Sequence, residues 1–216
     1  MHIELLLASQ SPRRREMIAW LGLPVSLVGV DIVEEPLKTE SPLTMTTRLA
    51  RAKAHAVAAS AREAWILAAD TVVDLDNLPL GKPRDPAEAR AMLRRLRGRP
   101  HAVHTTVVLY HPQAQQELGR RVTTQVLMRP YTDAEIEAYV ASRDPMDKAG
   151  AYAIQHTVFQ PVARVERCYT NVVGLPLCAV AALLAAWNLA LPVDIPSLCL
   201  THFNYACPGP DIGESL

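Results

Sequence analysis

Three consecutive arginines, Arg13, Arg14 and Arg15, follow Ser11-Pro12 shortly after the apolar run from Ile3 to Leu7. Serine is a preferred N-cap and proline suits the first helical position, so a helix is expected to begin here. Cations in the first turn meet the positive end of the helix dipole, which costs up to about 1 kcal/mol for each exposed charge. Hydroxyl, backbone N–H and guanidinium groups at a helix N-terminus bind phosphate well. The segment therefore predicts an anion site, with a solvated basic turn as the alternative.

Asp70 is a carboxylate inside an otherwise apolar run, Trp65 to Val73. Burying a carboxylate is costly unless it is paired, hydrogen-bonded or bound to a metal. Asp70 is thus a candidate to hold a divalent cation or to take a proton from water, and the alternative is a cap on a neighbouring loop. Lys82, between Gly81 and Pro83, follows the next turn and is placed to reach back toward Asp70.

Glu34-Glu35 follow the second apolar segment and, taken alone, are typical of a solvated acidic turn. Together with Asp70, one of them can complete a Mg²⁺ site, which commonly uses one or two carboxylates and the substrate's phosphates. Lys53 either lies on the exposed face of a long helix or supplies a further phosphate contact. Cations that hold a polyphosphate, beside acids that hold a metal and activate water, can hydrolyse a phosphoanhydride.

The charge balance argues against a nucleic-acid partner. Lysine plus arginine and aspartate plus glutamate number 22 each in 216 residues, and only 5% of the residues are aromatic. No global field then attracts a polyanion, and platforms for stacking bases are few. The chain also lacks the G-x-S-x-G elbow of serine hydrolases.

Other features favour a cytoplasmic protein without a membrane partner. The four cysteines form no CxxC pair, so reduced thiols are expected rather than a zinc site or a redox dithiol. Glu4 precedes only a very short apolar run, unlike a signal peptide. The apolar helix expected over 175–187 is shorter than the roughly 20 residues that span a bilayer.

Segments with strand and helix character alternate along the chain, which indicates an α/β fold. Two successive strand candidates within 101–128 imply a mixed twisted sheet flanked by helices. Residues 1–190 are expected to form one domain, and the proline-rich residues 191–216 a tail that lies over the surface or is disordered. The expected strands are 3–7, 25–33, 65–73, 101–110, 122–128 and 158–165.

Five motifs, in their order and spacing, resemble those of the Maf family of nucleoside triphosphate pyrophosphatases, from about residue 3 to 187. The resemblance implies a fold like that of the inosine-triphosphate pyrophosphatases, with a central cleft between two lobes, and a homodimer. The motifs are Ala8-Ser-Gln-Ser-Pro-Arg-Arg14, Ala69-Asp-Thr-Val-Val73, Leu80-Gly-Lys-Pro83, Asp147-Lys-Ala-Gly-Ala-Tyr152 with Ile154-Gln155, and Asn171-Val-Val-Gly-Leu-Pro176.

The resemblance also implies a reaction. Water attacks the α-phosphate of a nucleoside triphosphate with the help of Mg²⁺ or Mn²⁺, giving the monophosphate and pyrophosphate. Asp70 corresponds to the proton acceptor, Glu35 and Asp70 hold the metal, and Lys82 assists catalysis. The phosphate and metal positions of the family correspond to Ser9, Arg13, Arg14, Glu35, Lys53 and Lys82.

Base choice in the family depends on three positions, here Arg13, Thr71 and Gln155. This set resembles the branch that acts on dTTP and UTP, whereas the 7-methyl-GTP branch carries a tryptophan in place of Arg13. The Gln155 amide offers a donor and an acceptor, as the edge of uracil or thymine requires. The chain departs from the family pattern at Thr106, where glycine is usual, and at 156–159, which replace a glycine-rich stretch.

These observations predict a house-cleaning enzyme that hydrolyses dTTP, UTP or modified pyrimidine nucleotides. One alternative is a nucleotide-binding regulator of cell division with weak or no turnover, because the family name derives from a septation phenotype. A second alternative is a nucleic-acid binder that uses the arginine run, which the neutral net charge argues against.

Overall fold

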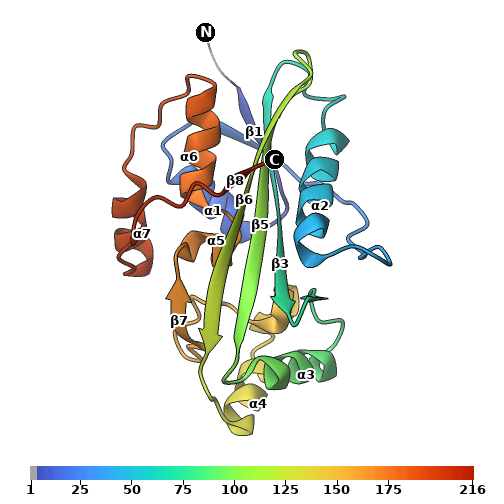
Figure 1. The fold of residues 1–216 in the computed structure, drawn as a ribbon, viewed down its shortest axis with the longest axis vertical. Coiled ribbons are helices and arrows are strands. Elements are labelled where there is room, and N and C mark those ends of the chain that lie inside the picture. The colour runs from blue at the N-terminus through green and yellow to red at the C-terminus, as the bar shows by residue number, and fades with distance from the viewer. Residues whose placement is uncertain (1–3) are drawn as a thin grey trace.

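The computed structural model describes residues 4–216, so Ile3, the first residue of the expected N-terminal strand, lies outside the described residues. Within this range eight strands form one sheet with the main order β2-β1-β3-β5-β6-β7, while β4 pairs with β3 and β8 with β6 (Figure 1). β1 is parallel to β2 and β3, and the other pairs are antiparallel, which confirms the predicted mixed α/β sheet. The strands are β1 (Leu5–Ala8), β2 (Val25–Val28), β3 (Trp65–Leu75), β4 (Leu78–Leu80), β5 (Pro100–His111), β6 (Gln116–Met128), β7 (Val162–Glu166) and β8 (Glu214–Ser215).

Helices flank the sheet on both faces, with α2 and α6 on opposite sides of it in Figure 1. None of the helices in residues 4–216 is both long and apolar enough to cross a membrane. The helices are α1 (Pro12–Ala19), α2 (Pro42–Ala56), α3 (Pro86–Leu96), α4 (Asp133–Ala141), α5 (Tyr169–Val173), α6 (Leu177–Ala186) and α7 (Ile195–Phe203), with the short 3-10 helices η1 (Asp144–Asp147) and η2 (Ala149–Ala151).

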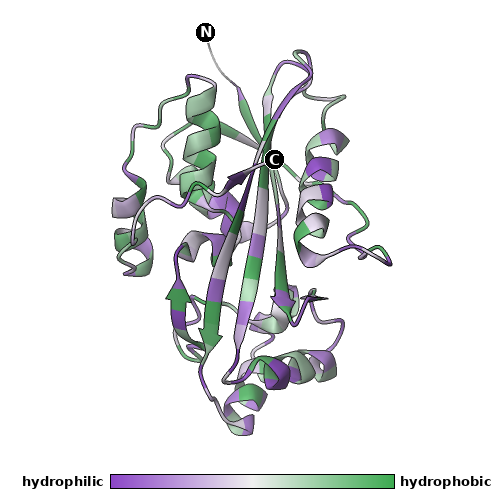
Figure 2. Ribbon diagram, viewed as in Figure 1, coloured by the Kyte–Doolittle hydropathy of each residue, from purple (hydrophilic) through white to green (hydrophobic). Residues whose placement is uncertain are grey.

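The central strand β3 is buried on both faces. Its side chains point alternately to the two faces, and each face packs into a different core cluster. Leu67 and Ala69 belong to the cluster that contains α1 and α6, whereas Ile66 and Ala68 belong to the cluster that contains α2. Successive side chains of a strand point to opposite faces, which produces this division. α6 is hydrophobic along most of its length in Figure 2, as expected for a helix packed on a sheet.

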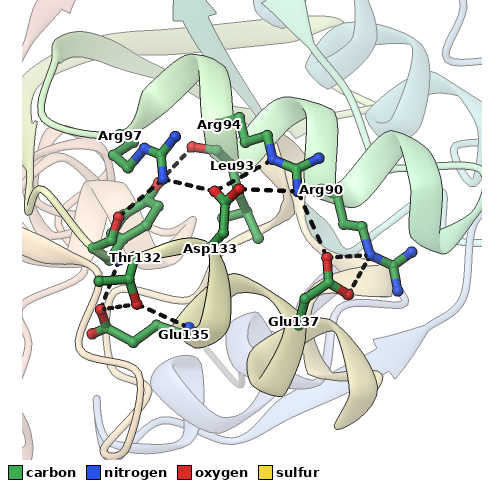
Figure 3. Close-up of polar contacts among 9 residues, drawn as sticks. Arg90, Leu93, Arg94, Arg97, Thr132, Asp133, Glu135 and Glu137 are labelled. Carbon is green, nitrogen blue, oxygen red and sulfur yellow. Dashed lines mark hydrogen bonds and ion pairs between the residues drawn. The ribbon is translucent and has the colours of Figure 1, made fainter.

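A second lobe, called the lower lobe from its place in Figure 1, lies at the other end of the sheet, where α3 and α4 pack together below β3 and β5. Tyr131 is almost fully buried between them, and its hydroxyl donates to the Leu93 carbonyl at 2.8 Å. Ion pairs connect the outer faces of the two helices (Figure 3), but exposed pairs contribute only about 0–1 kcal/mol each. The apolar contacts therefore contribute most of the stability of the lobe. The ion pairs are Arg90–Glu137 at 2.7 Å, Arg94–Asp133 at 3.5 Å, Arg94–Glu137 at 3.7 Å and Arg97–Asp133 at 2.8 Å.

The segment from residue 191 contains α7 and β8, and Ile195 and Cys199 of α7 are buried in the core cluster that contains α1 and α6. Trp20, the C-cap of α1, stacks on His202 of α7, with ring centroids 3.8 Å apart and planes 6° from parallel. β8 pairs with the middle of β6, and Gly119 leaves room there for the Leu216 side chain. A Cβ at Gly119 would lie 2.3 Å from that side chain, so the absence of a side chain allows this contact.

The bounds predicted for three of the strands were wrong. The strand expected over 25–33 ends at Val28, because its partner β1 ends at Ala8. The strand expected over 158–165 begins only at Val162, because the preceding residues form a turn in which the Phe159 N–H bonds His156 Nδ1. The strand expected over 122–128 instead begins at Gln116, because β6 pairs with β5 along its whole length from that residue.

His101 is a buried ionisable group in the lower lobe. Its Nε2 lies 2.8 Å from the Tyr152 hydroxyl, while its Nδ1 has no partner among the described residues. Burial lowers the pKa of His101 from 6.5 to about 4, because the charged ring would lose its hydration without gaining an anion.

This burial makes the stability of the fold pH-dependent. Below pH 6.5 His101 is protonated in the unfolded chain, whereas in the folded chain it becomes protonated only near pH 4. Between these two pH values acid therefore favours the unfolded state. Between pH 7 and pH 5 the wild type should lose about 2 kcal/mol more of its free energy of unfolding than His101→Gln does. Urea denaturation at both pH values measures the difference, and equal losses would contradict it.

Candidate active site

The side-chain alternation of β3 also places the candidate catalytic groups. Asp70 continues the series of Ile66 and Ala68 and points toward α2, whereas Thr71 continues the series of Leu67 and points toward α1. Each of these polar groups meets a cation from the helix on its own side. The strand thus carries a carboxylate on one face and a hydroxyl on the other, both bordering one cleft.

Lys53 of α2 contacts two carboxylates, the buried Asp70 and the exposed Glu34. Its ammonium lies 2.6 Å from Asp70 Oδ1 and 2.6 Å from Glu34 Oε1. Asp70 is 4% exposed and Lys53 is 7% exposed, so water compensates little of either charge. A buried charge requires a partner in such surroundings, and this explains why Lys53 points inward rather than lying on the exposed face of the helix.

The pKa values of the two carboxylates shift in opposite directions. Burial raises the pKa of Asp70 above its ordinary value, against the opposing effect of Lys53 and Arg14. Burial would also raise the pKa of Glu34, but the charge and hydrogen bond of Lys53 outweigh it and the pKa of Glu34 is lowered. Asp70 is therefore the more basic of the two, as a proton acceptor should be.

The glutamate beside Lys53 is Glu34 rather than Glu35, which the sequence analysis had selected. Glu35 does not line the main cleft; its main-chain carbonyl accepts a hydrogen bond from Arg48, and the residue lines a neighbouring hollow of about 590 Å³. This hollow also reaches Glu34 and Asp70. Two adjacent glutamates in an irregular segment give no register by which the sequence could distinguish them.

Arg14 is directed inward and holds two elements together. Its Nε donates to the Gly174 carbonyl at 2.7 Å and its Nη2 donates to Thr71 Oγ1 at 2.9 Å. Burial lowers the pKa of Arg14, while Asp70 and Glu34 act in the opposite sense. The guanidinium thus gives the cleft a fixed positive charge and ties α1 to β3 and α5.

Arg13 lies at the surface of the same helix and bridges the cleft. Its Nη1 lies 3.0 Å from Asp147 Oδ2, which comes from η1 in the lower lobe. Lys148 lies 2.6 Å from the other oxygen of Asp147, so this carboxylate is shared by two cations. A phosphate that binds Arg13 has to compete with Asp147 for the guanidinium.

The cleft between these groups has a volume of about 440 Å³, within the roughly 300–1,000 Å³ range of small-molecule sites. Ser9 is buried in its wall and accepts the Ser11 N–H at 3.1 Å. Lys82 is mostly exposed and lies 4.0 Å from Glu34 Oε2. The predicted residues that line the cleft are Ser9, Arg13, Arg14, Lys53, Asp70, Thr71, Lys82 and Gln155.

Three further charged residues line the cleft without a predicted role, Asp31, Asp147 and Lys148. Asp147 and Lys148 lie in the motif from Asp147 to Tyr152, and their adjacent opposite charges were an available signal. Their distant partner, Arg13, is fixed only by the fold and had no local signal.

Thr106 stands where the family pattern has glycine, and it lies outside the cleft lining. It pairs with Asp70 across β3 and β5, and its hydroxyl lies 2.8 Å from that of Thr46 in α2. The threonine therefore links α2, the helix that carries Lys53, to β5, the strand next to the one that carries Asp70.

The donor chemistry at Lys53 is compatible with a hard divalent cation. Asp70 Oδ1 and Glu34 Oε1 both contact the Lys53 ammonium, so a divalent cation would bind the other oxygen of each carboxylate. Mg²⁺ commonly binds one or two carboxylates together with phosphate and water oxygens. Within residues 4–216 no cluster of three or more histidine, cysteine or acidic side chains is arranged to hold a metal. Phosphate and water oxygens would have to supply the remaining ligands.

Comparison with known proteins relates this geometry to a family. The family model described as Maf-like protein matches residues 4–187. A dTTP/UTP pyrophosphatase of Geobacter metallireducens is 47% identical over 176 residues, or 82% of this chain and 92% of that protein. A dTTP/UTP pyrophosphatase of Myxococcus xanthus is 48% identical over 188 residues, or 87% of this chain and 94% of that protein. Among solved structures, the Staphylococcus aureus Ham1 protein aligns at 16% identity with a TM-score of 0.44, covering 59% of this chain and 72% of that one. On the family match and the two relatives, this chain belongs to the Maf-like protein family.

Proposed function

We propose that the protein hydrolyses dTTP and UTP to the nucleoside monophosphate and pyrophosphate. The observation that carries the proposal is the Asp70–Lys53–Glu34 group, in which Asp70 and Lys53 are buried and Glu34 is exposed, and which lines the same cleft as Arg13 and Gln155. The relatives named dTTP/UTP pyrophosphatase support the substrate class, since they are 47% and 48% identical over most of the chain.

The cationic groups of the cleft are assigned to the polyphosphate. Arg13 and Lys82 are accessible and can contact phosphate oxygens directly, while Arg14 adds a fixed charge from the wall. Ser9 adds a hydroxyl beside them. Such preorganised charges stabilise the negative charge that develops on the leaving pyrophosphate.

Asp70 is assigned to activation of water. Its carboxylate accepts a proton as the water oxygen bonds to the α-phosphorus and the bond from this phosphorus to the α–β bridging oxygen breaks. The bridging oxygen leaves with the pyrophosphate. The raised pKa of Asp70 makes it a better base for this step than an exposed aspartate, and Lys53 holds one of its oxygens in place.

Mg²⁺ or Mn²⁺ is part of the proposal, with Asp70 and Glu34 as its protein ligands and Glu34 in place of Glu35. A bound divalent cation supplies charge neutralisation on the phosphates and polarises the water. Glu34 suits this role because its lowered pKa keeps it ionised.

The Gln155 amide, which lines the same cleft, is assigned to the base edge. The homodimer, the cytoplasmic location and the house-cleaning role belong to the proposal through the resemblance to the family.

A panel of nucleoside triphosphates tests the substrate and the bond cleaved. Purified protein with Mg²⁺ should convert UTP and dTTP to monophosphate and pyrophosphate, with kcat/KM at least about tenfold above that for CTP. The reason is that a Gln155 amide oriented to donate to O4 and accept from N3–H of uracil meets the reversed donor and acceptor of cytosine. In heavy-oxygen water the label should enter the monophosphate. Release of orthophosphate, or label in the pyrophosphate, would contradict attack at the α-phosphorus.

Asp70→Asn tests the proposed base. The amide cannot accept the proton, so kcat should fall by about 10²–10⁴-fold, while circular dichroism shows a folded protein. Asp74→Asn is the matched control, because Asp74 lies on the same face of β3 but pairs with His104 outside the cleft. Activity of Asp70→Asn equal to that of Asp74→Asn would remove Asp70 from the mechanism.

A further inference from the structure

Tyr139 of α4 is a buried tyrosine whose hydroxyl bridges two loops of the lower lobe. The hydroxyl donates to Asp144 Oδ2 at 2.6 Å and accepts the Ala153 N–H at 3.0 Å. The residue is 3% exposed. Burial and the bond to Asp144 raise the pKa of Tyr139, so the hydroxyl keeps its proton and remains a donor.

Ala153 begins the loop that carries Gln155 into the cleft, and this loop is closed by its own contacts. The His156 N–H donates to the Ala153 carbonyl at 3.2 Å, and the Phe159 N–H donates to His156 Nδ1 at 2.9 Å. Tyr139 therefore holds the residue at which the loop begins.

The Tyr139 ring also packs against the far side of this loop. It stacks on Phe159, with centroids 4.3 Å apart and planes at 18°, and meets His156 edge-on at 4.7 Å. These ring contacts hold His156 and Phe159 in place, so the aromatic cluster restricts the loop next to Gln155.

A chain of alternating charges connects Tyr139 with Arg13. Asp144 Oδ1 lies 3.1 Å from Lys148 Nζ, and the same ammonium lies 2.6 Å from Asp147 Oδ1. Asp147 Oδ2 then lies 3.0 Å from Arg13. The group assigned to phosphate and the loop assigned to the base are therefore parts of one network of hydrogen bonds.

We propose that Tyr139 is a positioning residue for pyrimidine recognition: its hydroxyl fixes the main chain at Ala153 and thereby the placement of the Gln155 amide relative to Arg13. The inference rests on the proposed function, since it concerns the base specificity of that site. An amide discriminates uracil from cytosine only when its donor and acceptor are held in register with the base. Displacements near 1 Å in a positioned group can change rates by about 10²-fold.

Tyr139→Phe removes the hydroxyl and keeps the ring. Its matched control is Tyr131→Phe. Like Tyr139, Tyr131 is buried, lies outside the cleft lining and packs on Phe159, at 4.9 Å. Its hydroxyl donates to the Leu93 carbonyl and takes no part in the network of Asp144 and Ala153. Tyr139→Phe should raise KM for UTP more than it lowers kcat and reduce the UTP-to-CTP ratio of kcat/KM by about tenfold or more. Tyr131→Phe should leave this ratio unchanged.

Hydrogen exchange at the Ala153 amide gives a readout that needs no turnover. The amide should exchange faster in Tyr139→Phe than in the wild type or in Tyr131→Phe. A wild-type ratio that persists in Tyr139→Phe, or a ratio that changes equally in both variants, overturns the positioning role while leaving the proposed function intact. A wild type without preference for UTP over CTP overturns the base assignment itself. Unchanged exchange at Ala153 overturns the contact between Tyr139 and the loop.

Discussion

The pairing of Asp70 with Lys53 is the constraint on which the site depends. A carboxylate on a central strand, 4% exposed, is tolerated only beside an equally enclosed cation, and the 2.6 Å contact supplies it. This requirement sets the position of α2, and Thr106 fastens that helix through Thr46. Glu34 shares the same ammonium, so the loop after β2 is also brought to the site.

Because side chains of β3 alternate between its two faces, the residue proposed to activate water and the residue that anchors Arg14 lie on opposite faces of the strand. On one face, Asp70 meets Lys53 and opens on the reaction site; on the other, Thr71 meets Arg14, whose donors are used by Thr71 and Gly174. Two adjacent residues of one strand thus organise two different helices. The lower lobe adds Asp147 and the loop of Gln155, so that residues far apart in the chain border a single cleft.

Much of the fold and site could be predicted from the sequence, because caps, apolar periods and motifs are local signals. Asp70 was recognisable as a charge in an apolar run, and the helix start after Ser11 was recognisable from its serine cap and the following proline. The choice between Glu34 and Glu35 was not predictable, since it depends on the path of an irregular segment. The partner of Arg13 was not predictable either, because Asp147 lies 134 residues away.

The stacking of Trp20 on His202 gives the molecule an optical probe of its C-terminal segment. An indole against an imidazole 3.8 Å away emits differently from one in water, so the fluorescence of Trp20 should respond when α7 leaves α1. Trp65 and Trp187 contact each other at 4.2 Å and supply a background that their replacement by phenylalanine would remove. Docking of the tail thereby becomes a spectroscopic observable, independent of any assay of the cleft.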